Sequence, residues 1–145
     1  LEKKDDEEKK LDGWFRTGDL CEEINKKIYL LGRLDNQFNI GGEKVQAEEL
    51  ESIIESIEII SCALCYQVPE KVMGYKIICL VETVEALNNS ELKKFISKQL
   101  DKYPNHYKPV EIIKVSSVPR TQNGKKIRNE EKIIKYLNEL SKPYQ

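Results

Sequence analysis

The residues with the clearest potential for chemistry lie near the C-terminus, in a basic loop with the sequence VPRTQNGKKIR. In this loop Lys125 directly follows an Asn-Gly pair, and Lys126 and Arg128 come next. Asn-Gly is typical of a tight turn, because glycine adopts left-handed backbone conformations without steric cost. A lysine at such a turn presents a compact positive charge that suits anionic ligands. A basic loop can also be nothing more than a solvated surface, so the rest of the sequence has to decide.

Composition limits the classes of protein that the sequence can encode. Its 145 residues suffice for one domain with a modest core and part of another. With 39% hydrophobic and 34% charged residues, it reads as soluble and globular. The 24 basic and 25 acidic side chains nearly cancel, so no overall field attracts nucleic acid or anionic lipid. Any anion-binding site must therefore be local.

Hydropathy and cysteine usage indicate a cytoplasmic protein. No apolar run approaches the roughly 20 residues that span a bilayer, and the N-terminal LEKKDDEEKK has no signal-peptide core. The thiols Cys21, Cys62, Cys65 and Cys79 fit that compartment without a disulfide framework. The CALC segment offers a metal or redox pair. In a buried strand, however, residues three apart face opposite sides of the sheet, so we expect plain buried thiols and no metal site.

The elements that must position the basic loop follow from hydrophobic periodicity. After a charged segment at 1–10, the sequence predicts a β-hairpin over 21–33 and a strand-like run over 38–45 that Gly41 and Gly42 interrupt. A helix is predicted over 46–57, followed by two strands over 58–68 and 75–83. The helix carries one apolar stripe, formed by Ala47, Leu50, Ile53, Ile54 and Ile57.

Two more helices and a short strand complete the predicted order. Ser90 is expected to cap a helix with the inner face Leu92, Phe95, Ile96 and Leu100. A strand is predicted over 111–115, and Asn129 caps a last helix with the apolar residues Ile133, Ile134, Leu137 and Leu140. We therefore predict an α+β fold, with a small mixed sheet, about three helices and a preceding β-hairpin.

Three segments, GWFRTGDL, GRLDNQFNIGGEKVQAEELE and VPRTQNGKKIR, occur in this order between Gly13 and Arg128. Together they resemble the late motifs of the adenylate-forming superfamily, which includes acyl-CoA synthetases, peptide-synthetase adenylation domains and luciferases. The family's Gly-, Ser- and Thr-rich phosphate loop has no counterpart here. The resemblance thus implies that 1–35 is the end of a large N-terminal domain, with its hairpin and hinge, and that 36–145 is the small C-terminal lid.

The resemblance also implies an activity and roles for individual residues. Such an enzyme joins a small carboxylic acid to the α-phosphate of ATP and then transfers the acyl group to a thiol. Lys125 matches the catalytic lysine, which brings a positive charge to two mutually repelling anions. Asp19 matches the carboxylate that binds the ribose hydroxyls, and Arg33 matches a second nucleotide contact. Mg²⁺ would be bound mainly by the missing large domain.

Asp35 falls at the family's hinge position, about which the lid turns between the two half-reactions. The turned lid would present Gly41 and Gly42 to pantetheine and Lys44 to a phosphate of coenzyme A. The glycine pair could instead be a bulge in a strand. Departures from the family pattern lie at Asn39, at Lys126, which replaces a common apolar residue, and at Gln46-Ala47, which makes a less well capped helix start.

These resemblances favour an ATP-dependent acyl-CoA synthetase whose isolated lid fragment is inactive. The sequence leaves open an adenylation domain that loads an amino or aryl acid onto a carrier protein's phosphopantetheine. It also leaves open a non-catalytic module that binds a carrier or another partner. Neither the acyl substrate nor the oligomeric state can be read from these residues, because the family selects its acid in the large domain.

Overall fold

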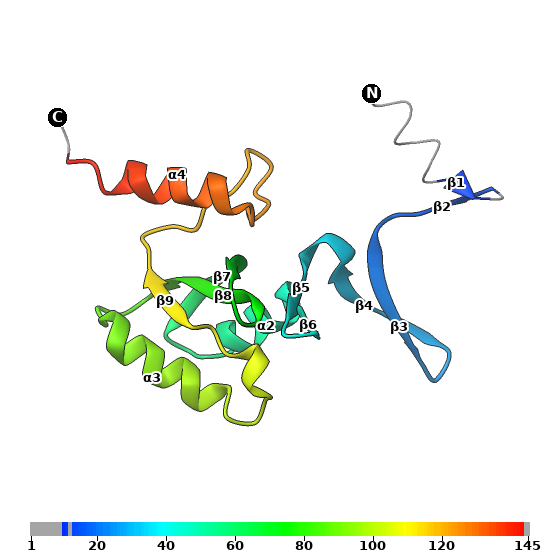
Figure 1. The fold of residues 1–145 in the computed structure, drawn as a ribbon, viewed down its shortest axis with the longest axis horizontal. Helices are drawn as coiled ribbons and strands as arrows, with labels where there is room; N and C mark the ends of the chain where they lie inside the picture. The colour runs from blue at the N-terminus through cyan, green and yellow to red at the C-terminus, as the bar shows by residue number, and fades with distance from the viewer. Residues whose placement is uncertain (1–9, 12, 144–145) are drawn as a thin grey trace.

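A three-stranded mixed sheet forms the centre of the computed structural model, which describes residues 10–11 and 13–143 (Figure 1). Strand β7 (Ile60–Glu70) lies antiparallel to β8 (Gly74–Thr83), and β9 (Glu111–Lys114) pairs with β8 in parallel. The parallel pair needs a crossover, and helix α3 (Asn89–Gln99) supplies it. The predicted α+β fold with a small mixed sheet is confirmed.

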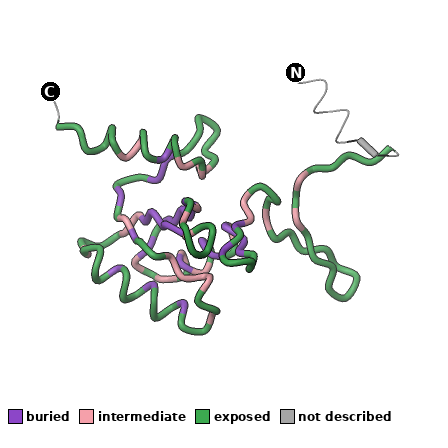
Figure 2. The backbone as a smooth tube through the Cα atoms, viewed as in Figure 1, coloured by how far each residue is buried: buried purple, intermediate pink, exposed green. Residues whose placement is uncertain are grey.

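Helices cover both faces of this sheet, α3 and α4 from opposite sides in Figure 1. Helices α2 (Ala47–Glu55) and α3 bury Leu50, Ile54, Leu92 and Ile96 against one face, and α4 (Glu130–Leu140) buries Ile133 against the other. The buried positions in Figure 2 gather around the sheet accordingly. The loop of residues 115–129, which carries Lys125, connects the end of β9 to the start of α4.

The two cysteines of the CALC segment lie on opposite faces of β7, as predicted. Cys65 belongs to the apolar cluster beneath α2 and α3, whereas Cys62 belongs to the cluster beneath α4. Successive side chains of a strand alternate between faces, so residues three apart must separate in this way. Within residues 10–11 and 13–143, no group of three His, Cys, Asp or Glu side chains could hold a metal ion.

Two hairpins precede the central sheet. Strands β3 (Asp19–Ile24) and β4 (Lys27–Arg33) form the first, and β5 (Gln37–Ile40) and β6 (Glu43–Gln46) form the second. Gly41 and Gly42 have φ angles of 60° and 87°, as a two-residue turn with two left-handed positions requires. The glycine pair is thus a hairpin turn and not a bulge within one strand.

Short elements complete the chain. Strands β1 (Lys10–Leu11) and β2 (Trp14–Phe15) pair with each other, and the 3₁₀ helix η1 (Leu34–Asn36) joins the two hairpins. A second 3₁₀ turn, η2 (Asn105–Tyr107), lies between α3 and β9. Of the charged segment predicted at 1–10, residues 1–9 lie outside the described part of the chain. None of the described helices is long and apolar enough to cross a membrane.

Helix boundaries and inner faces differ from prediction in a few places. Asn88, not Ser90, caps α3, because Asn88 and Glu91 form a reciprocal capping box with N···O distances of 2.9 and 3.0 Å. The predicted inner faces are also too wide. Phe95, Ile134 and Leu140 are about half exposed, since a single helix buries only a narrow stripe against a sheet.

Candidate nucleotide and acyl-transfer site

The loop that carries Lys125 is a tight hairpin. The amide of Thr121 donates to the Lys125 carbonyl at 2.8 Å, and Gly124 donates back to the Thr121 carbonyl at 2.9 Å. Arg120 and Lys126 form an isolated antiparallel bridge beside them. Gly124 has a φ of +82°, which an L-amino acid with a side chain rarely adopts. The predicted Asn-Gly turn is therefore present, and Lys125 is exposed next to it.

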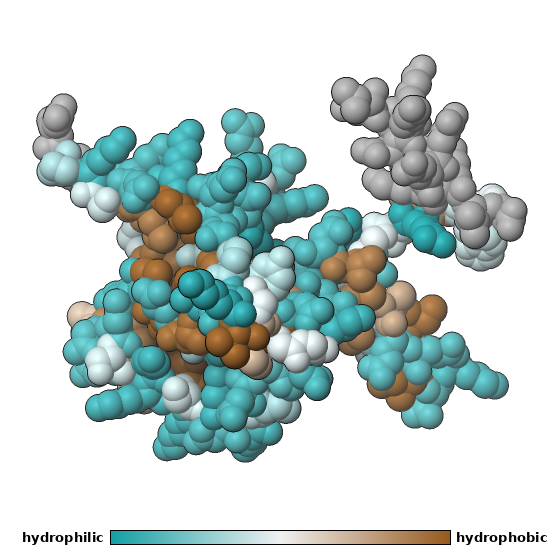
Figure 3. Space-filling model, viewed as in Figure 1, coloured by the Kyte–Doolittle hydropathy of each residue, from teal (hydrophilic) through white to brown (hydrophobic). Residues whose placement is uncertain are grey.

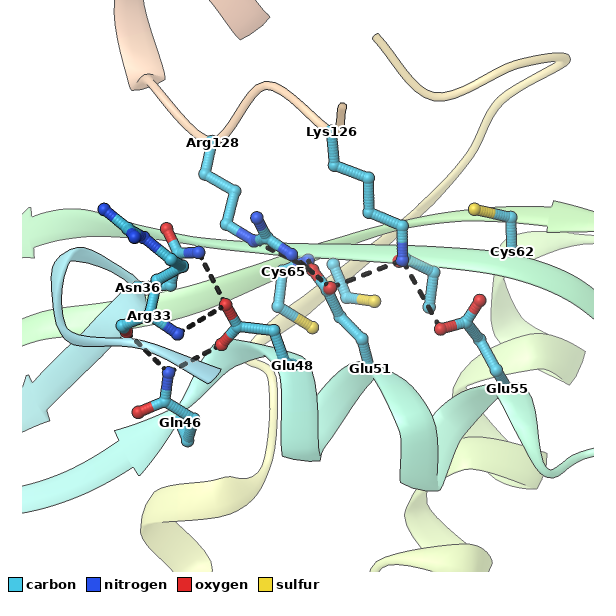
Figure 4. A network of polar contacts seen from close by, with 12 residues as sticks. Arg33, Asn36, Gln46, Glu48, Glu51, Glu55, Cys62, Cys65, Lys126 and Arg128 are labelled. Atoms are coloured by element: carbon cyan, nitrogen blue, oxygen red, sulfur yellow. Dashed lines mark hydrogen bonds and ion pairs between the residues drawn. The ribbon is translucent and has the colours of Figure 1, made fainter. Parts of the chain in front are cut away.

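The two adjacent lysines have opposite environments. Lys126 points inward: its Nζ lies 2.6 Å from the Ala63 carbonyl oxygen, 3.3 Å from Glu51 and 3.4 Å from Glu55 (Figure 4). The Lys125 ammonium makes no hydrogen bond or ion pair with any residue that the structure describes. Backbone alternation in the extended stretch puts neighbours on opposite sides. Lys125 is thus the lysine whose charge is available to a ligand.

Glu51 of α2 fixes the same loop from inside the protein. Its side chain is 2% exposed and accepts hydrogen bonds from Arg128 Nη2 at 2.6 Å and from the Cys65 amide at 2.7 Å. Burial by itself would lower the pKa of Lys126, but the charges of Glu51 and Glu55 raise it above its usual value. Lys126 therefore remains a cation bound to carboxylates.

Glu51 did not emerge from the sequence as a functional candidate. One signal could have found it: Glu51 lies four residues after Ala47 and three before Ile54, inside the apolar stripe of its helix. A carboxylate in that position must be paired when it is buried, so it predicts a basic partner from elsewhere in the chain.

Asp19 and Arg33 lie directly opposite each other in the register of β3 and β4. Arg33 Nη1 is 3.2 Å from Asp19 Oδ1 and donates to the Thr17 carbonyl oxygen at 2.6 Å. Arg33 Nη2 is 3.7 Å from Asp35 Oδ2. The structure therefore brings three of the predicted site residues together. No hydrogen bond or ion pair joins them to Lys125 among the described residues.

Asp35 lies in η1, and its own side chain is 82% exposed. Side chains at the start of α2 hold its neighbours instead. Glu48 Oε1 accepts from the Arg33 amide at 3.1 Å and from Asn36 Nδ2 at 2.6 Å, and Gln46 Nε2 donates to the Arg33 carbonyl oxygen at 2.7 Å. We call Arg33, Asn36, Gln46 and Glu48 the hinge latch. Figure 4 shows Glu48 of this latch beside Glu51 on helix α2.

The hinge latch explains two features of the start of α2. Gln46 occupies the N-cap position without a side-chain capping bond, as its residue type predicts, and uses its amide for the latch. Burial by itself would raise the pKa of Glu48, but hydrogen bonds from Asn36, Gln46 and backbone amides lower it below its usual value. Glu48 is therefore an anion at neutral pH.

The turn of Gly41 and Gly42 is fixed at both residues. Gly41 donates its amide to the Met73 carbonyl oxygen at 2.9 Å, and Gly42 donates to Asn39 Oδ1 at 3.0 Å. A Cβ on Gly41 would collide with the end of the Met73 side chain. Lys44 is exposed on β6 of the same hairpin and lines a cavity of about 660 Å³ that β6 and α2 form with the hairpin of β3 and β4.

Comparison with known proteins identifies relatives over most of the chain. Residues 49–125 match the family model described as AMP-binding enzyme C-terminal domain. The chain is 30% identical over 123 residues to a medium/long-chain fatty acid–[acyl-carrier-protein] ligase of Mycobacterium tuberculosis. This match covers 81% of this chain and 23% of the ligase. It is 30% identical over 92 residues to 2-succinylbenzoate–CoA ligase of Salmonella typhimurium. This second match covers 63% of this chain and 20% of the ligase.

Solved structures agree on the fold. The o-succinylbenzoate CoA synthetase of Bacillus subtilis, in complex with an acyl-adenylate intermediate, superposes with a TM-score of 0.75. The match has 22% identity and covers 96% of this chain but 26% of the synthetase. ATP-bound MatB of Rhodopseudomonas palustris gives a TM-score of 0.73 at 23% identity, over 97% of this chain and 27% of MatB. The chain thus spans about a quarter of the length of the proteins it resembles.

Proposed function

The chain belongs to the AMP-binding enzyme C-terminal domains of the adenylate-forming acyl-CoA ligase superfamily, and we propose that it forms the lid of an ATP-dependent acid–thiol ligase. In this proposal residues 36–145 are the lid and 1–35 end a large N-terminal domain. The observation that carries the proposal is the contrast between two adjacent lysines: the exposed Lys125 ammonium has no hydrogen bond or ion pair with a described residue, whereas the partly buried Lys126 ammonium is paired with carboxylates.

In the first half-reaction a carboxylate attacks the α-phosphorus of ATP, the acyl–phosphate bond forms and pyrophosphate leaves. The two reactants are both anionic, and their repulsion is strong in a site closed to water. Lys125 would contact an oxygen of each and stabilise the charge in the transition state. Its position in a rigid hairpin supports this role, because a fixed charge needs little reorganisation during the reaction.

Asp19 and Arg33 would bind the nucleotide. A carboxylate offers two acceptor oxygens to the two hydroxyls of a ribose, and the salt bridge with Arg33 holds Asp19 at the base of the hairpin. Magnesium would shield the phosphates of ATP. We place it on the large domain, since the described residues include no cluster of ligands for a metal ion.

In the second half-reaction a thiol attacks the acyl carbon and AMP leaves. Asp35 lies where the lid would turn, and the turn of Gly41 and Gly42 would then approach pantetheine closely. Glycine permits that approach because it has no side chain. Lys44 would meet a phosphate of coenzyme A. We favour coenzyme A as the acceptor because the segment NIGGEKVQAEELE resembles acyl-CoA synthetases. The phosphopantetheine of a carrier protein is the alternative, since the relatives include ligases of both kinds.

Apolar side chains on the hairpin of β3 and β4 support an adjoining large domain. Hydrophobic residues are visible on this hairpin in Figure 3, and Ile28 and Leu30 are 75% and 74% exposed. Trp14 in β2 is 80% exposed. Apolar surface of this kind marks a site of protein contact, and the large domain is the partner we propose.

The experiment compares ATP–pyrophosphate exchange by the full-length protein and by this chain alone, with a panel of carboxylic acids. We expect exchange by the full-length protein only, because catalysis needs the acyl and phosphate sites held together. Robust exchange by this chain alone would contradict the domain assignment. No exchange by the full-length protein with any acid would favour the non-catalytic binding module.

A further inference from the structure

One side chain of α2 holds the loop on which Lys125 depends. Glu51 is almost wholly buried. It accepts hydrogen bonds from Arg128 Nη2 at 2.6 Å, from Arg128 Nε at 3.3 Å and from Lys126 Nζ at 3.3 Å. Glu55, one helical turn further on, takes a second contact with Lys126 at 3.4 Å. We call Glu51, Glu55, Lys126 and Arg128 the loop anchor. It joins a helix of the lid to the loop by charge-assisted hydrogen bonds.

These contacts lie on one side of Lys125 in the sequence, and a second set lies on the other. Arg120 donates to the Gly124 carbonyl oxygen at 2.9 Å and lies 3.2 Å from Cys62 Sγ. The Lys125 backbone is therefore held from both directions, whereas its side chain is exposed. Because Lys126 is bound inward, Lys125, the residue before it in this extended stretch, points outward.

We infer that Glu51 is a positioning residue for Lys125, acting through Lys126 and Arg128. The inference rests on the proposed function, in which Lys125 stabilises the adenylation transition state. A lysine side chain has four rotatable bonds, so only its backbone can be fixed in advance, and a displacement of about 1 Å can cost about 100-fold in rate. The loop anchor supplies that fixed backbone.

Burial of the charged groups of the loop anchor costs desolvation free energy that an apolar contact would not cost. A buried ion pair is often no more stabilising than hydrophobic residues of similar volume, because both charges lose their hydration. A role in folding alone thus gives no reason for two cations and two carboxylates at this point. A role in orientation does, since hydrogen bonds between charged groups restrict direction as well as distance.

The test uses Glu51→Gln and Lys126→Met in the full-length enzyme, with the half-reactions measured separately. We expect adenylation to fall by about 10- to 100-fold in both variants. Thioester formation from supplied acyl adenylate should stay within about twofold, since the Gly41 and Gly42 turn does not touch the anchor. Lys126→Arg, which keeps the charge and several donors, should restore most of the adenylation rate.

Controls separate positioning from folding and from the proposed function itself. Glu58→Gln removes an exposed carboxylate and should change neither half-reaction. If Glu51→Gln and Lys126→Met lose both half-reactions to the same extent, the loop anchor serves folding only and the inference is overturned. Normal adenylation in both variants, with adenylation lost in Lys125→Ala, would overturn it too and leave the proposed function intact. If Lys125→Ala itself retains adenylation, the proposed role of Lys125 fails first.

Discussion

Glu48 and Glu51 lie one turn apart on α2, and each binds a different part of the proposed machinery. Glu48 accepts hydrogen bonds from Arg33 and Asn36 at the proposed hinge, while Glu51 binds Lys126 and Arg128 of the loop that carries Lys125 (Figure 4). Residues three apart share a helix face, so one rigid helix connects the hinge with the loop. A rotation of the lid about the hinge would therefore move Lys125 with α2.

The contrast between the adjacent lysines predicts their chemical reactivity. Acylating reagents attack the neutral amine, and Lys126 is partly buried beside carboxylates that raise its pKa. We expect Lys125 to be acetylated by acetic anhydride at least about tenfold faster than Lys126 in the full-length protein without ATP. Tandem mass spectrometry can separate the two positions. Equal rates in the folded protein, rather than only after unfolding in urea, would contradict the inward contacts of Lys126.

The hinge position predicts a separation of the two half-reactions. Proline at position 35 fixes φ near −65° and removes an amide donor, so Asp35→Pro should restrict the backbone rotation. We expect adenylation to persist within about tenfold and thioester formation to collapse, because proline should tolerate the conformation that presents Lys125. Pyrophosphate exchange and single-turnover transfer from preformed acyl adenylate measure the two steps. Equal loss of both would indicate misfolding, and no loss of either would remove Asp35 as the hinge.

The hinge latch predicts a stability that depends on pH. Hydrogen bonds hold the pKa of Glu48 in the folded protein below the usual value of 4.5. The ionised carboxylate thus stabilises the folded state above pH 4.5, and this contribution is lost as the pH falls through the lowered pKa. Glu48→Gln should therefore lower the melting temperature at pH 7 and have a smaller effect in acid. A difference that grows in acid would contradict this sign, and Glu58→Gln serves as the matched control.

Much of this arrangement could be predicted from the sequence because it follows from local patterns. The apolar stripe of α2, the Asn-Gly turn before Lys125 and the pairing of the hairpin strands are local, and the structure has each of them. The cap of α3 was misplaced by two residues because Asn88 and Ser90 are both good caps, and the reciprocal bond with Glu91 decides between them.

The contacts of Glu51 in the loop anchor and of Glu48 in the hinge latch could not be predicted in the same way. Glu51 meets Lys126 and Arg128 across more than seventy residues of sequence, and no local rule pairs such distant charges. The hinge latch joins Arg33 and Asn36 to residues 12 to 15 positions further along the chain. It does so through Gln46 and Glu48, whose residue types suggest only the start of a helix. These contacts depend on how α2 packs against β7 and β4, which the sequence pattern alone does not specify.

The most direct test of the proposed function is Lys125→Ala in the full-length enzyme, assayed for each half-reaction. Removal of a preorganised positive charge should lower adenylation by a factor of about 100 or more. Thioester formation from supplied acyl adenylate should be much less affected, because the turned lid would present Gly41 and Gly42 instead. Retention of pyrophosphate exchange within about threefold of the wild-type rate would contradict the role of Lys125, since a group that stabilises the transition state cannot be removed without cost.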